Sequence, residues 1–164
     1  MRERRDVREG TTNVLYATLK ACHLLAVIVW VGGMAFVLFC LRPAARVLDP
    51  PARIALMHAA IRRFLAVVAV AIAVIFVCGT AMVAIAWSTA SRAGLRFNMP
   101  LDWYVMFAVF VHIRAALFPR LDAALREQRW ADGATTLGTI RWEVSANLVL
   151  GVFVTVLVRL GGTA

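Results

Sequence analysis

Three histidines are the residues of this sequence best suited to chemistry. His23 and His112 lie inside long apolar segments, whereas His58 precedes the start of another apolar run by about six residues. Imidazole is the usual protein ligand of haem iron, and it also suits copper. A titratable group inside a membrane span is costly and therefore suggests a functional site. We take His23 and His112 as candidate ligands and interpret His58 as a surface or headgroup residue.

The depth of the two candidate ligands decides whether they can share one iron. His112 lies about ten residues into its apolar segment. If the first helix enters the membrane near Val14, His23 lies at a similar depth. If Lys20 marks the membrane interface, the two histidines differ by about seven residues, or roughly 10 Å along a helix. The sequence leaves both options open, and a hydrogen bond between helices is the plain alternative for each histidine.

Other residues share the helix face of His23. Trp30, Gly33 and Met34 follow it at i+7, i+10 and i+11, a spacing that places them on one side of a helix. Gly33 would let a second helix or a flat cofactor approach closely. Met34 offers a soft thioether that suits copper(I). The alternative is that the glycine and the methionine serve ordinary helix packing.

The last apolar segment carries polar or small residues at every fourth position, namely Glu143, Asn147, Gly151, Thr155 and Arg159. Such a stripe should face other helices rather than lipid. One interpretation is a helix surface that faces a cofactor or transfers protons. The other is hydrogen bonding between helices. In the second case Glu143 would pair with an arginine, the candidates being Arg141, Arg114 and Arg63. The basic residues at these helix ends, Arg62, Arg63 and Arg114, would hold a propionate or a phosphate headgroup, or form an ordinary interfacial belt.

The composition shows where these residues must be positioned. Of the 164 residues 62% are hydrophobic, and the mean hydropathy is +0.80, whereas soluble domains have about 45–50% apolar residues. The chain is therefore predicted to be an integral membrane protein whose main partner is the lipid bilayer. The net charge of +9 does not indicate nucleic-acid binding, because the arginines lie mostly outside the apolar runs, where they meet lipid headgroups. Three cysteines within apolar segments argue against a disulfide framework.

The hydropathy pattern predicts one domain over residues 1–164 with spans at about 14–41, 64–90, 101–118 and 139–160. We expect the first helix to stop at Arg42-Pro43 and the second to begin early, near Pro51. The polar segment after Phe118 is expected to extend the third helix to about Asp132-Gly133. The predicted fold class is all-α, an integral membrane up-down four-helix bundle. The Lys/Arg balance weakly places both termini outside and the long loops in the cytoplasm.

Several motifs resemble a known family. His23 followed by Trp30-Val31-Gly32-Gly33-Met34, Phe36 and Leu41-Arg42-Pro43-Ala44 resembles the first helix of the copper resistance protein D family. Arg63-Phe64, Gly79 and Arg141-Trp142-Glu143 are similar to its later helices. Cys78 departs from the usual threonine, and the extra helices of many members are missing. The resemblance implies a multi-pass protein of the bacterial inner membrane that acts in copper homeostasis, with copper or haem b and a redox or copper-handling partner.

A second family shares part of this pattern. The positions of His23, Trp30, Gly33 and His112 are similar to those in the bacterial haem-binding membrane protoporphyrinogen oxidase. That family's proline-arginine and tyrosine-histidine stretch after the first helix is missing here. Together the resemblances imply that His23 is a ligand and that haem b is a cofactor. The alternatives to a copper-resistance-D-like protein are an oxidoreductase acting on a porphyrinogen and a structural membrane subunit without cofactor, and self-association is open in each case.

Overall fold

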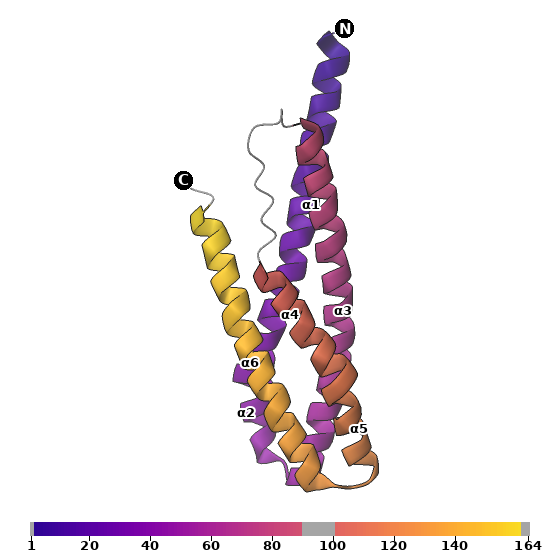
Figure 1. Ribbon diagram of the computed structural model, residues 1–164, viewed down its shortest axis with the longest axis vertical. Helices are drawn as coiled ribbons and strands as arrows, with labels where there is room; N and C mark the ends of the chain where they lie inside the picture. The colour runs from indigo at the N-terminus through magenta and orange to yellow at the C-terminus, as the bar shows by residue number, and fades with distance from the viewer. Residues whose placement is uncertain (1, 90–100, 162–164) are drawn as a thin grey trace. The chain divides into compact units, whose positions relative to one another are not determined.

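The described part of the chain folds almost entirely into helices. The computed structural model describes the backbone of residues 2–89 and 101–161 and the side chains of residues 10–85 and 103–156, and these parts contain no β-strand. The predicted all-α fold class is therefore confirmed (Figure 1). The helical elements in chain order are α1 (Arg2–Phe36), η1 (Val37–Leu41), α2 (Arg42–Ala44), η2 (Ala45–Val47), α3 (Pro50–Thr89), α4 (Leu101–His112), η3 (Ile113–Leu117), α5 (Phe118–Arg126) and α6 (Trp130–Gly161).

Within the described residues, four helical segments are long and apolar enough to cross a bilayer: Gly10–Val47, Pro50–Ile85, Trp103–Arg126 and Trp130–Val156. Large apolar side chains are exposed along them; Phe39 is 72% exposed and Val149 is 70% exposed. Such surfaces are stable against lipid tails but costly in water. The chain is therefore a multi-pass membrane protein. The second of these helices begins at Pro50, close to the start expected from the sequence.

The first helical segment differs from its expected end at Arg42-Pro43, because helical turns continue to Val47. Proline inside a helix removes one i→i−4 hydrogen bond, and its ring clashes with the preceding turn. The π-helical segment η1 widens the helix just before Pro43, where the Arg42 amide donates to the Val37 carbonyl. The segment η3 repeats this device before Pro119, since the Phe118 amide donates to the Ile113 carbonyl. The widened turns let both prolines stay within helices.

The turn between α5 and α6 also differs from expectation. The sequence predicted one continuous helix to about Asp132-Gly133, but α5 ends at Arg126 and α6 begins at Trp130. Gln128 takes a left-handed conformation, with φ of 55°. The Arg129 amide donates to the Ala124 carbonyl at 2.9 Å, and the Gln128 amide donates to the Leu125 carbonyl at 3.2 Å. These two bonds form the Schellman motif that ends many helices.

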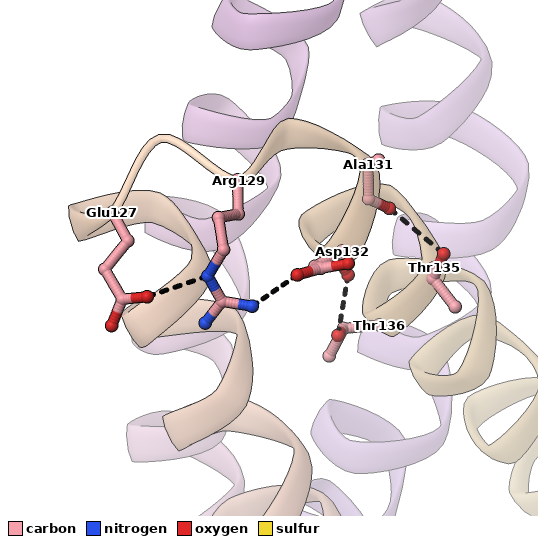
Figure 2. Close-up of polar contacts among 6 residues, drawn as sticks. All are labelled: Glu127, Arg129, Ala131, Asp132, Thr135 and Thr136. Atoms are coloured by element: carbon pink, nitrogen blue, oxygen red, sulfur yellow. Dashed lines mark hydrogen bonds and ion pairs between the residues drawn. The ribbon is translucent and has the colours of Figure 1, made fainter.

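Side chains complete this turn (Figure 2). Arg129 Nε donates to Glu127 Oε2 at 2.7 Å, and Arg129 Nη1 pairs with Asp132 in the first turn of α6. The hydrogen bond that Arg129 donates to Glu127, followed by the one it donates to Asp132, raises the pKa of the Arg129 guanidinium above its ordinary value. Thr135 and Thr136 donate back to the carbonyls of Ala131 and Asp132. Exposed ion pairs contribute little energy, so their role is to hold the geometry of the turn.

Replacing the left-handed residue of this turn by glycine is expected to stabilise the protein. An L-residue in this conformation costs about 1 kcal/mol, whereas glycine adopts it freely. Gln128→Gly should therefore raise the midpoint of thermal unfolding in detergent by a few degrees, on the order of 1 kcal/mol in stability. Gln128→Ala is the matched control, because it removes the side chain and keeps the strain. Equal midpoints for the two variants would contradict the prediction.

The chain divides into two compact units, which are described separately. One contains Met1–Trp30 and Val68–Phe97, and so pairs the first part of α1 with the last part of α3. The other contains Val31–Val67 and Asn98–Ala164. Its core residues come from all four membrane-length segments, so this unit is a four-helix bundle; they are Ala45, Ile54, Met57, Ile61, Leu65, Ile113, Leu117, Leu121 and Ile140.

Candidate functional site

His23 is held by the backbone of a neighbouring helix in its own unit. Its Nδ1 lies 3.1 Å from the carbonyl oxygen of Ile75 on α3. A carbonyl only accepts hydrogen bonds, so Nδ1 carries a proton, and in the neutral imidazole Nε2 then keeps its lone pair. An Nδ1–H bond to a backbone carbonyl is a common way to orient a metal-binding histidine. The structure thus leaves His23 with the tautomer that a ligand through Nε2 requires.

Gly79 on α3 has no side chain, and this leaves space for the His23 ring to pack against the helix. A Cβ atom added at Gly79 would lie 3.6 Å from Cε1 and 3.7 Å from Nδ1 of His23, which is ordinary contact. Any larger side chain would occupy the space of the imidazole, because the ring already lies at van der Waals distance. Lys20 lies within α1 rather than at its start, since this helix begins at Arg2. His23 is therefore well inside a helix, and its depth in the membrane stays a prediction.

His112 is oriented by a carboxylate. Its Nδ1 lies 2.9 Å from Oε1 and 3.0 Å from Oε2 of Glu143 on α6. A carboxylate that accepts from Nδ1–H leaves Nε2 as the nitrogen able to bind a metal, and such pairs raise the basicity of the ligand. The His112 side chain is 53% exposed and that of Glu143 is 19% exposed. His112 ends α4 where the π-helical η3 begins, and such widened turns are frequent at functional sites.

Glu143 pairs with His112 rather than with the arginines that the sequence suggested, as far as the described residues show. Further along α6, Asn147 and Gly151 are buried, as the stripe predicted. Thr155 is exposed and its hydroxyl donates to the Gly151 carbonyl of its own helix at 2.8 Å, so the prediction that the stripe faces other helices is wrong at this position. The Arg159 side chain lies outside the described residues. The stripe therefore joins α6 to its neighbours through a histidine pair and through close packing.

Met34 lies in the core of the four-helix unit. It is 2% exposed, and its sulfur accepts a hydrogen bond from Asn147 Nδ2 at 3.7 Å. Asn147 is 4% exposed, and its Oδ1 has no partner among the described residues. The thioether thus meets a buried amide whose hydrogen bonding is incomplete. The role of Met34 as a copper ligand stays a prediction.

Gly33 and Trp30 take packing positions. A Cβ atom at Gly33 would lie 2.4 Å from Cε2 of Phe64 on α3, closer than such atoms approach in proteins. Gly33 therefore allows a close contact between α1 and α3 within the four-helix unit, which is the alternative that the sequence analysis kept open. Trp30 is 4% exposed. Their contact with a cofactor stays a prediction.

His58 has a carboxylate partner that sequence reasoning missed. Its Nε2 lies 3.1 Å from Asp122 Oδ1 on α5, and its ring stacks on Phe118 with centroids 5.0 Å apart. Asp122 also pairs with Arg126. A half-open pocket of about 430 Å³ lies beside this histidine, lined by His58, Ala59, Arg62 and Arg63. The pair joins residues 64 positions apart, so only the fold reveals it.

The cysteines and the carboxylates do not form a metal site with the histidines in the described part of the chain. Cys22 and Cys40 are exposed, Cys78 is buried, and all three are free thiols. The described residues hold no group of three or more His, Cys, Asp and Glu side chains placed to bind a metal ion. His23 and His112 belong to different units, so their joint binding of one iron stays a prediction. Each histidine is nevertheless oriented through Nδ1 on its own.

The fold and these side chains define an all-α multi-pass membrane protein with two oriented imidazoles. Comparison of the chain with protein-family models, with curated proteins and with solved structures finds no match. The resemblances to the copper resistance protein D and protoporphyrinogen oxidase families therefore stay expectations drawn from the motifs of the sequence.

Proposed function

We propose that this protein is a haem b-binding protein of the bacterial inner membrane, similar to copper resistance protein D, with His23 as an axial ligand. The observation that carries the proposal is the hydrogen bond from His23 Nδ1 to the Ile75 carbonyl, opposite Gly79. It holds the ring in one orientation and, in the neutral imidazole, leaves Nε2 as the nitrogen with a lone pair. His112, oriented by Glu143, is the second candidate ligand.

These residues fit haem better than they fit a copper ion bound by protein alone. The porphyrin supplies four ligands to the iron, so the protein needs to add only one or two axial groups. A copper ion without porphyrin needs several protein ligands that converge on one point. Copper bound through the histidines and Met34 is the alternative within the same proposal, and copper homeostasis is its physiological setting. When bound, haem b would supply one-electron chemistry, and the chain would orient its axial ligands and shield it from water.

The absorption spectrum of the purified protein tests the proposal. In detergent, the oxidised and dithionite-reduced protein should show a Soret band, and metal analysis should find iron. His23→Ala should strongly reduce the haem content and with it the band, because the variant lacks the imidazole proposed to bind the iron. Glu143→Gln should weaken haem retention about 10–100-fold if His112 is also a ligand, as expected when the orienting partner of a ligand is lost.

His58→Ala is the matched control, because His58 is engaged with Asp122 and Phe118 and should not affect the spectrum. A colourless protein that contains no iron or copper and resists reconstitution would overturn the proposal and favour a structural subunit. Growth of a strain that lacks protoporphyrinogen oxidase, restored by this chain but not by His23→Ala, would instead favour the porphyrinogen-oxidising enzyme.

A further inference from the structure

An arginine near the end of the first membrane-length segment has an incomplete environment. Nη1 of Arg42 on α2 is buried and has no hydrogen-bond partner among the described residues. A guanidinium nitrogen that is removed from water without an acceptor loses its hydrogen bonds to water and forms no others, which costs free energy. An arginine is charged at every accessible pH, so it cannot escape this cost by losing its proton. The site is therefore short of a hydrogen-bond acceptor.

Three more arginines lie close enough to repel its charge. Arg141, Arg46 and Arg53 act electrostatically on Arg42, and all of them carry the same sign of charge. They come from α6, η2 and α3, so the fold of the four-helix unit brings them together from separate elements. Like charges near one another repel, and the repulsion is strongest where water is excluded. The ion pairs recorded among the described residues involve none of these four arginines.

We infer that these four arginines, Arg42, Arg46, Arg53 and Arg141, bind the phosphate of an anionic lipid headgroup. A phosphate has several strong acceptor oxygens, and guanidinium groups bind them with matching geometry. One anion would accept from the buried Nη1 of Arg42 and would offset the repulsion among the four cations. The site is independent of His23 and goes beyond the haem proposal.

The position of the cluster favours a lipid over a dissolved anion. Arg42 and Arg46 lie in the last turns of the segment Gly10–Val47, and Arg53 lies in the first turns of Pro50–Ile85. These are the depths at which a bilayer presents its headgroups. In the sequence, Val47 follows Arg46 and is 88% exposed, and Phe39 precedes Arg42 by three residues and is 72% exposed. An acyl chain can pack along these apolar side chains while its phosphate meets the arginines.

The test uses the full chain in detergent, freed of lipid and titrated with phosphatidylglycerol, phosphatidylcholine or inorganic phosphate while thermal unfolding is followed. Phosphatidylglycerol should raise the unfolding midpoint at lower concentration than either other ligand. Arg141→Gln should raise the midpoint of the lipid-free protein, because it removes one repelling charge. The same variant should weaken the apparent affinity for phosphatidylglycerol about fivefold to tenfold.

Arg120→Gln is the matched control, since it removes an exposed charge of α5 that is not among the groups acting on Arg42. It should leave both quantities close to those of the unchanged protein. Equal effects of Arg141→Gln and Arg120→Gln would overturn the inference and indicate an unspecific basic belt. Protection by inorganic phosphate alone, with no further gain from phosphatidylglycerol, would overturn the assignment to a lipid. A loss of lipid-free stability in Arg141→Gln would show that the arginine serves structure instead.

Discussion

Gly33→Ala is expected to lower the midpoint of thermal unfolding, while the same change at the adjacent Gly32 is expected to raise it slightly. A Cβ atom at Gly33 would lie 2.4 Å from Cε2, 3.2 Å from Cζ and 3.3 Å from Cδ2 of Phe64. Carbon atoms pack best at about 3.5–4.0 Å, so the ring must rotate or the two helices must separate. Overpacking of this kind costs about 1–3 kcal/mol.

Gly32 provides the control because a Cβ atom there has no neighbour within 4 Å. Gly32→Ala then reports the helix propensity alone, a gain of about 0.5–1 kcal/mol. Both variants can be compared by thermal unfolding in one detergent, with circular dichroism at 222 nm as the readout of helix content. Phe64→Ala in the Gly33→Ala background should recover part of the loss, as a coupling between the two positions. Similar midpoints for the two alanine variants would show that the contact does not limit the packing of α1 on α3.

Asn147 is the second position where we expect a large effect, with opposite signs for two substitutions. Its side chain is buried, donates only to the weakly accepting sulfur of Met34, and keeps an oxygen without a partner among the described residues. A buried unpaired polar atom costs about 1–3 kcal/mol. Asn147→Leu keeps a similar volume and removes that atom, so it should stabilise the protein by about 1 kcal/mol. Asn147→Asp places an uncompensated charge in the core and should cost about 3 kcal/mol or more.

Thermal unfolding of both variants in detergent measures these effects. Asn13→Leu is the control for helix propensity, because Asn13 is exposed in α1 and its replacement changes no buried contact. Acidic solution should reduce the defect of Asn147→Asp, since a protonated carboxyl carries no charge. If Asn147→Leu destabilises the protein, the prediction that the unpaired amide oxygen is a net cost would be wrong.

Local patterns of the sequence predicted much of the fold. Long apolar runs predicted the all-α class and the four membrane-length helices, because a span needs about 20 apolar residues. The start of α3 near Pro51 followed from the tolerance of a first helical turn for proline. The burial of Asn147 and Gly151 followed from their positions on one helix face, four residues apart. Each of these features depends on residues that are close in the chain.

The differences arise where a local rule was opposed by another interaction. Pro43 was expected to end a helix, but η1 widens the preceding turn and removes the clash. The end of α5 was expected later, because the left-handed residue of the turn is Gln128 and not a glycine. No local pattern identifies such a glutamine as a helix end. The capping hydrogen bonds of the turn compensate for the strain.

The sequence by itself determined the number of apolar helices, their approximate positions and the presence of two histidines within them. The tertiary structure alone decided the partners: His23 with the Ile75 carbonyl, His112 with Glu143, and His58 with Asp122. The physical reason is that periodicity shows which residues share a helix face. It does not show how far a neighbouring helix is rotated or shifted along its axis, and these two quantities decide which side chains meet. The same rotation brings Arg53 and Arg141 near the Arg42–Arg46 pair, an association between helices that no spacing in the chain reveals.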